Sequence, residues 1–404
     1  MEKATKNTHL NHMEDNIFLG HIEGTREAVH FIRSFRDLLQ GQSQRALQTS
    51  VKWDGAPAIW VGPHPENKKF IVAKKSLFNK VPLYYSSEAQ IKKSKDLSPE
   101  LKQKFLIAFN SYKNADLSKL IQGDFLFDDK DIQITKVDGQ RYVTFHPNTI
   151  AYSVPVGTEL AKEIQKAKMG IVFHTTYTGN SIESLTASAG VKLGKAPKGV
   201  WQIDADLPDM SGTASLTKAE TNQIDKELTN IGTHFRYISR DTFTKLNDPY
   251  IAAFCTTYTN AFIRNNVTPT AEEAAAGLPE FIMAKFKKEI DKRKTAAGKA
   301  KQQELMKEAI SPIMSVPKNE LVSVFHLYYS LQKAKKLIIK KLSSAGFIKT
   351  FLKTADGWKV TGQEGFVATD KISRNSVKLV DRLEFSYANF SDDVIKGWQS
   401  DFRR

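Results

Sequence analysis

A lysine near the start of the chain stands in a setting that favours nucleophilic chemistry. Lys52 follows the apolar Val51 and precedes an Asp-Gly pair, Asp54-Gly55, after which the apolar run Ile59–Val61 begins. An Asp-Gly pair is a strong signal for a tight turn between two strands. A lysine held at such a turn is partly stripped of water, which favours the neutral amine, a usable nucleophile. An exposed lysine in a surface hairpin is the alternative interpretation of the same residues.

Four further positions carry side chains that suit chemistry at a phosphate. Acidic residues stand beside glycine in two stretches with strand character, Gly123-Asp124 and Glu364-Gly365. Phe173 ends an apolar run, and Lys378 lies in another short apolar run. Carboxylates are hard oxygen ligands for Mg²⁺, whereas a lysine amine can balance charge that develops on a phosphate.

The pattern Lys-x-Asp-Gly at residues 52–55 resembles the nucleophile motif of the covalent nucleotidyltransferases, which are the ATP-dependent DNA and RNA ligases and the mRNA capping enzymes. That family next carries a Gly-Glu-type strand, an aromatic strand, a Glu-Gly-aliphatic-Val strand and a lysine-containing strand. The similar segments here follow in the same order: Gly123–Leu126, Gly170–Phe173, Glu364–Val367 and Val377–Val380. The combination looks most like the ligase-like proteins of bacteriophages.

The resemblance implies a role for each of these positions. Lys52 would attack the α-phosphate of ATP and carry AMP covalently, while Lys378 would contact the same phosphate. Asp124 and Glu364 would bind Mg²⁺ (or Mn²⁺) or a ribose hydroxyl, and Phe173 would stack on the purine. The structural alternatives are paired strand-edge acids, a simple core phenylalanine and a lysine at a sheet edge.

The remaining site predictions concern the turn and the polynucleotide. Asp54 and Gly55 lie in the nucleophile motif, and we expect Asp54 to orient the amine or help to hold the metal. Lys74 and Lys75 follow a predicted strand and could meet the 5′-phosphate of a polynucleotide.

This sequence departs from the family pattern in several places. Pro57-Ala58 stand where many members carry an arginine, Val380 replaces a second lysine, and Asp124 is shorter than glutamate. Only residues 379–404 follow Lys378, too few for the OB-fold that DNA ligases and capping enzymes append there. The extra mass lies within the catalytic domain instead, which favours an RNA ligase over an enzyme that seals nicked duplexes.

The composition of the chain indicates which partners and which cellular compartment to expect. The net charge of +15 favours a polyanionic partner such as nucleic acid. A basic cluster at Lys287, Lys288, Lys292 and Arg293 suits contact with a phosphate backbone, with a solvated helix face as the alternative. The single cysteine excludes an intrachain disulfide and favours a reducing compartment. No apolar run is long enough to span a membrane, so we expect no membrane partner.

The strand signals divide the chain into three parts. Residues 49–180 and 355–404 carry them, and we expect these two ranges to form one ligase-type adenylation domain of antiparallel sheets. Residues 1–48 form a predicted helical segment that packs against the domain that follows. Residues 181–354 form a predicted insertion that is mostly helical and basic. The predicted fold class is therefore α+β.

Taken together, the residues and the resemblance predict an ATP-dependent polynucleotide ligase. RNA is the preferred substrate, and DNA is the alternative within the same class. A nucleic-acid-binding protein that keeps the fold without catalysis, or a phage structural protein, is the alternative outside it. We expect a cytoplasmic monomer, in an infected host cell if a phage encodes the chain.

Overall fold

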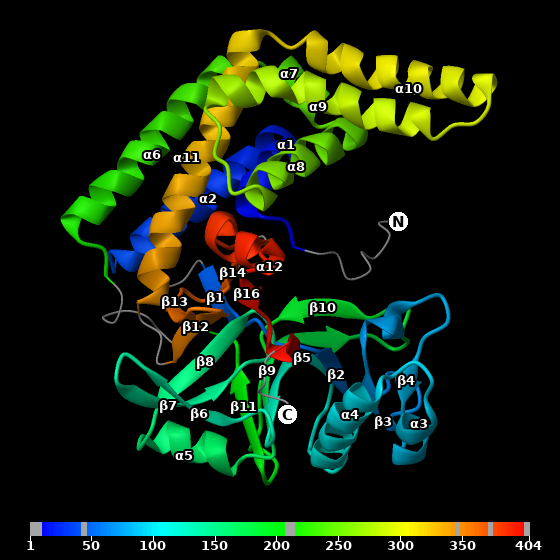
Figure 1. Cartoon of the computed structure of the whole chain (residues 1–404), viewed down its shortest axis with the longest axis vertical. Coiled ribbons are helices and arrows are strands. Elements are labelled where there is room, and N and C mark those ends of the chain that lie inside the picture. The colour runs from blue at the N-terminus through cyan, green and yellow to red at the C-terminus, as the bar shows by residue number, and fades with distance from the viewer. Residues whose placement is uncertain (1–9, 42–46, 207–214, 345–347, 371–374, 400–404) are drawn as a thin grey trace.

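The computed structural model describes residues 10–41, 47–206, 215–344, 348–370 and 375–399. Parts of the predicted segments 1–48, 181–354 and 355–404 lie outside these ranges. Long helices fill one end of the molecule, and largely antiparallel sheets fill the other (Figure 1). The predicted α+β class is therefore confirmed. In the described part of the chain, no helix has the length and apolar character needed to cross a bilayer.

Two separate parts of the chain share the core of the helical end. The N-terminal part supplies α1 (Asn16–Leu19) and α2 (His21–Leu39). The inserted part supplies α6 (Lys218–Tyr237), α7 (Arg240–Leu246), α8 (Pro249–Arg264), α9 (Ala271–Asp291), α10 (Ala296–Met314) and α11 (Lys318–Ser343). Phe31 and Phe35 of α2 are buried in one cluster with Ile224 of α6 and Leu331 of α11. The N-terminal helices therefore pack mainly against the inserted helices, although the predicted partner was the domain that directly follows them.

Pro279 in the sequence predicts a helix that starts at Glu280, but the structure begins this helix, α9, earlier. The helix begins at Ala271, and Pro279 lies inside it. A capping box explains the earlier start, because the Thr270 side chain accepts from the Glu273 amide and the Glu273 carboxylate accepts from the Thr270 amide. Two of the free amides at the helix start are satisfied in this way. The cap therefore outweighs the preference of proline for a first turn.

The largest sheet carries the elements that follow the Lys52 turn. Its strands are β2 (Ala58–Pro63), β3 (Phe70–Ala73), β4 (Tyr84–Tyr85), β5 (Leu120–Asp128), β9 (Met169–Thr178), β10 (Thr186–Ala189) and β11 (Val200–Asp204), in the order β10-β9-β5-β2-β3-β4 with β11 also paired to β9. The short α3 (Glu88–Lys93) and α4 (Pro99–Tyr112) pack beside it, and the side chain of Ser98, directly before Pro99, caps α4. Phe105 of α4 is buried in one cluster with Phe125 and Phe173 of the sheet.

A second sheet joins distant parts of the chain. Its strands are β6 (Gln133–Val137), β7 (Gln140–Phe145), β8 (Ile150–Pro155), β12 (Lys349–Thr354), β13 (Gly357–Val360) and β16 (Val394–Ile395). The helix α5 (Glu159–Lys166) packs on β7 and β8. Strands β10, β11 and β12 all fall inside the range 181–354 that was predicted as the helical insertion. The sheets therefore extend past both predicted boundaries, and the inserted helices run from α6 to α11.

A small third sheet lies between the helices and the larger sheets (Figure 1). Its strands are β1 (Leu47–Lys52), β14 (Gly365–Asp370) and β15 (Ser376–Leu379), in the order β1-β14-β15. Phe366 and Ala368 of β14, with Val377 and Leu379 of β15, are buried in the same cluster as the helices. The helical end therefore supports the sheet that carries Lys52.

Charged side chains are buried where the helices meet the segment after β15. Lys335 Nζ lies 2.7 Å from both carboxylate oxygens of Glu14. The guanidinium of Arg382 lies 3.1 Å from Asp15 Oδ1 and donates to Tyr328 Oη at 2.9 Å. Burial raises the pKa of Glu14, but the positive charges of Lys335 and Arg382 outweigh burial and bring the pKa down to about 2. We call Glu14, Asp15, Lys335 and Arg382 the buried ion cluster.

Candidate active site

The third sheet brings together three predicted site residues that lie far apart in the sequence. In its antiparallel register, Lys52 pairs with Gly365, the residue after Glu364. On the other side of β14, Val367 pairs with Lys378. Adjacent strands are about 4.8 Å apart, so two strand spacings separate the backbones that carry the two lysines.

Lys52 and Glu364 form an ion pair at the edge of this sheet. The Lys52 amine donates to Glu364 Oε1, and the Lys52 side chain is 32% exposed whereas that of Glu364 is 10% exposed. The second carboxylate oxygen, Glu364 Oε2, is buried without a hydrogen-bond partner among the described residues. A buried acceptor without a partner is costly in a protein that binds nothing there, so this oxygen suits a ligand hydroxyl or a cation.

The electrostatics of the site follow from burial and crowding. Burial raises the pKa of Glu364 to about 7; the charge of Lys52 opposes the shift, and the charges of Asp54 and Asp124 add to it. Burial likewise lowers the pKa of Lys378, and the positive charge of Lys52 lowers it further. The two lysines thus repel each other, as expected of amines that converge on one anion.

Lys378 is held in place by the N-terminal segment. Its backbone amide donates to the carbonyl of Asn11 at 3.0 Å, and His12 lies opposite it as a parallel bridge. Burial lowers the pKa of His12 to about 2 despite the opposing charge of Glu14, so the imidazole is neutral. The segment that leads into the helices therefore borders the site.

Asp54 is held by hydrogen bonds to the residues at the start of β8. Its buried carboxylate accepts from Asn148 Nδ2 at 2.6 Å and from the amides of Thr149 at 2.6 Å and Ile150 at 2.8 Å. Its own amide donates to Tyr152 Oη at 2.6 Å. These bonds fix the turn after Lys52 onto β8, so Asp54 positions the nucleophile motif.

Gly55 brings the turn against Asp124. A Cβ at residue 55 would lie 2.6 Å from Asp124 Cβ, so only glycine allows this approach. Asp124 lies on β5 opposite Ala58, and its Oδ2 is 3.6 Å from His174 Nε2. The predicted metal ligand is therefore close to the turn, and its charge contributes to the raised pKa of Glu364.

Phe173 does not lie where the resemblance implies. Its ring is fully buried and packs against Tyr112 of α4, with the ring centres 5.6 Å apart. Successive side chains of a strand point to opposite faces, so the next residue, His174, is the one beside Asp124. His174 was missed in the sequence, because it lies at an irregularity of β9, between Phe173, which pairs with Gly123, and Thr175, which pairs with Gln122.

The predicted polynucleotide contacts fall in two places. Lys74 and Lys75 follow β3 at the end of the sheet level with Asp124, because Ala73 pairs with Trp60. The Lys74 amine donates to the carbonyl of Asp96 at 2.8 Å, and Lys75 is exposed.

The second group lies away from the site. Lys287, Lys288, Lys292 and Arg293 are exposed near the tip of the hairpin formed by α9 and α10, remote from the third sheet (Figure 1). Lys292 pairs with Glu289 at 2.7 Å, which partly offsets its charge. The structure thus separates this basic cluster from Lys52.

Few side chains at the site could coordinate a metal ion. Among the described residues, no group of three or more His, Cys, Asp or Glu side chains could hold a metal ion. The oxygens present are those of Asp124 and the unpartnered Oε2 of Glu364. Mg²⁺ commonly binds one or two carboxylates and completes its shell with water and substrate phosphates, so this set fits a substrate-bridged ion.

The fold and site describe an α+β protein whose buried glutamate, Glu364, pairs with Lys52 and lies close enough to Lys378 to influence its pKa. A family model described as a family of unknown function (DUF6267) matches residues 7–393. The chain therefore belongs to this family. Neither a curated protein nor a solved structure matches the chain.

We expect Glu364→Gln to stabilise the protein at neutral pH. The folded pKa of Glu364, about 7, lies above its ordinary value of 4.5, so the folded state binds an extra proton between these two pH values. The contribution of Glu364 to the free energy of unfolding should therefore fall as the pH rises from about 4.5 to 7, whereas the neutral, buried His12 contributes a rise over most of this range. The variant lacks the Glu364 contribution, so its free energy of unfolding should rise relative to that of the wild type, by up to about 3 kcal/mol above pH 7.

Urea unfolding at several pH values between 4.5 and 8 measures this difference. Glu183→Gln, at an exposed glutamate, is the matched control and should follow the wild type. A difference in stability between Glu364→Gln and the wild type that stays constant across this pH range would mean that Glu364 does not carry the raised pKa.

Proposed function

We propose that this protein is an ATP-dependent polynucleotide ligase that acts through AMP bound covalently to Lys52. The observation that supports the proposal is the meeting of Lys52 at the end of β1, Glu364 directly before β14 and Lys378 on β15, in one three-stranded sheet. More than 300 residues separate the first of them from the other two, and the nucleotidyltransferase motifs require this meeting.

The geometry suggests how the first step would proceed. The Lys52 nitrogen attacks the α-phosphorus of ATP, so a P–N bond forms while the bond to the bridging oxygen breaks and pyrophosphate leaves. The amine must lose a proton, and Glu364 Oε1 already accepts from it. A carboxylate whose pKa is raised to about 7 is well matched to take that proton near neutral pH.

The neighbouring groups would balance charge in this step. The Lys378 amine would face the α-phosphate and offset the negative charge that develops there. Asp124 would hold Mg²⁺ (or Mn²⁺), which would supply positive charge to the phosphates when bound; Glu364 is an alternative ligand to this ion, in place of its role as the base. His174, beside Asp124, takes the place of Phe173 as the ring nearest the nucleotide.

Two further transfers would complete ligation. The 5′-phosphate of a polynucleotide displaces Lys52 from AMP, which breaks the P–N bond and joins the two phosphates. A 3′-hydroxyl then attacks that 5′-phosphate, which forms the phosphodiester and releases AMP. Lys74 and Lys75 would meet the end being joined, and the basic cluster on α9 would hold the polynucleotide farther away. RNA is the preferred substrate because the additional part of this chain, the helices α6 to α11, is inserted within the catalytic part and differs from the OB-fold of DNA ligases.

Incubation with α-labelled ATP and Mg²⁺ or Mn²⁺ tests the activity. The expected result is an acid-labile label on the protein that is discharged by pyrophosphate. Addition of 5′-phosphorylated RNA should then yield sealed product faster than nicked duplex DNA does. The absence of label with either metal would refute the activity, and faster sealing of DNA would overturn the RNA preference.

A further inference from the structure

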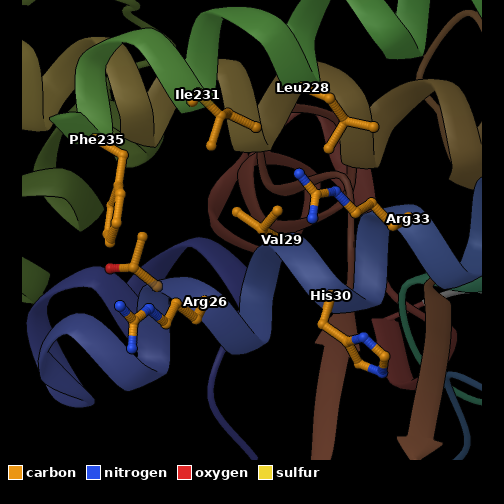
Figure 2. Close-up of a pocket in the computed structure, with 9 residues that line it drawn as sticks. Arg26, Val29, His30, Arg33, Leu228, Ile231 and Phe235 are labelled. Carbon is orange, nitrogen blue, oxygen red and sulfur yellow. The ribbon is translucent and has the colours of Figure 1, made fainter.

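A groove between α2 and α6 lies outside the site described above. Its volume is about 240 Å³, and its apolar lining comes from Val29 on α2 and Leu228, Ile231 and Phe235 on α6 (Figure 2). A groove of this size is too small to receive a protein helix, whose interface needs hundreds of Å² on each side. Its dimensions suit a small molecule.

Arg33 gives this apolar groove a positive charge. Figure 2 shows its guanidinium between the two helices, close to Val29 and Leu228. The other basic side chains at the rim have acidic partners, since Arg26 pairs with Glu23 at 2.8 Å and His30 lies 3.1 Å from Asp370. Within the described residues Arg33 has no such ion pair, and none of the groove's lining residues is acidic.

The lining also limits the chemistry of the ligand body. The hydroxyl of Thr25, which borders the groove, already donates to the carbonyl of His21 at 3.2 Å. The rest of the floor offers only hydrocarbon and one aromatic ring. A nucleobase placed there would lose its hydrogen bonds to water without replacement, so an alkyl or aryl body fits better.

We propose that the α2–α6 groove binds a small organic anion, an alkyl carboxylate whose chain lies on the apolar floor and whose head group pairs with Arg33. The charge is essential to this assignment, because a guanidinium that faces an apolar floor is complementary to a carboxylate carried on a hydrocarbon chain. This site is independent of the proposed ligase chemistry.

Calorimetric titration of the full-length protein with sodium octanoate tests the proposal. Octanoate should bind at one site, and 1-octanol and octylamine should bind at least about tenfold more weakly because they lack the carboxylate. Arg33→Gln should weaken octanoate binding by about tenfold. Lys226→Gln removes one charge from an exposed position on α6 outside the groove and should leave binding unchanged.

Gly232 offers a second variant that preserves the fold. It lines the groove on α6, and a Cβ there would meet no atom within 4 Å. Gly232→Leu should therefore fill the groove, keep the helix and abolish octanoate binding. Equal binding of octanol, or binding that survives both variants, would overturn the proposal. So would a lack of octanoate binding, and weaker binding of an oligoribonucleotide by both variants would then assign the groove to the polynucleotide.

Discussion

Lys52→Arg should yield a folded protein that takes up no label from α-labelled ATP. Arginine keeps the positive charge that faces Glu364, and the partly exposed Lys52 side chain leaves room for it. A guanidinium stays protonated in proteins and is no nucleophile, so the P–N bond does not form. We expect the rate of labelling to fall by about a thousandfold or more, as when a covalent nucleophile is removed from other enzymes.

The controls separate chemistry from folding. Lys69→Arg, at an exposed lysine before β3, should be labelled like the wild type. Thermal unfolding should show that Lys52→Arg unfolds near the wild-type temperature. Undiminished labelling of Lys52→Arg would place the nucleophile elsewhere and refute the proposed first step.

Lys335→Met should be among the most destabilising single changes in the helical end. It leaves the Glu14 carboxylate fully buried without the amine that lies 2.7 Å from both of its oxygens. Arg382, at 3.7 Å from Glu14, gives only partial compensation. Removal of one partner from a buried pair typically costs about 3–5 kcal/mol, so we expect a loss of that size in urea unfolding.

A double variant distinguishes charge from packing. Glu14→Met combined with Lys335→Met removes both charges and should recover most of the loss, because no uncompensated charge remains. Lys333→Met, at an exposed position on the same helix, should change stability by less than about 0.5 kcal/mol. A double variant as unstable as the single one would show that the packing of Lys335, rather than its charge, matters.

Local signals in the sequence predict most of the elements. The hairpin of β2 and β3 and the Ser98-capped α4 follow from turn residues, apolar runs and caps within a few positions. β10 and β11 were missed because they are short strands that depend on pairing with β9, a contact that no local pattern encodes. Propensity is a weak guide where tertiary pairing decides.

In the candidate site, too, some features could be predicted from the sequence and others depend on long-range contacts. The meeting of Lys52 with Glu364 and Lys378 was expected from motif order rather than from any spacing along the chain. The sequence predicted Phe173 as the aromatic ring of the site, but the neighbouring residue His174 is the one that lies near Asp124. A sequence motif can locate a strand, but it does not determine which face of the sheet each of its side chains points to. Glu14 could not be predicted as buried, because its charge partner Lys335 lies on a distant helix.

The third sheet sets a practical limit on dissecting this protein. One face of this sheet packs against the helices through the side chains of Phe366, Ala368, Val377 and Leu379. A truncated chain without α6 to α11 would expose this hydrocarbon to water and release the scaffold beneath Lys52. Any shortened form made for biochemistry must keep the helices, and isolated sheets should aggregate instead of reacting with ATP.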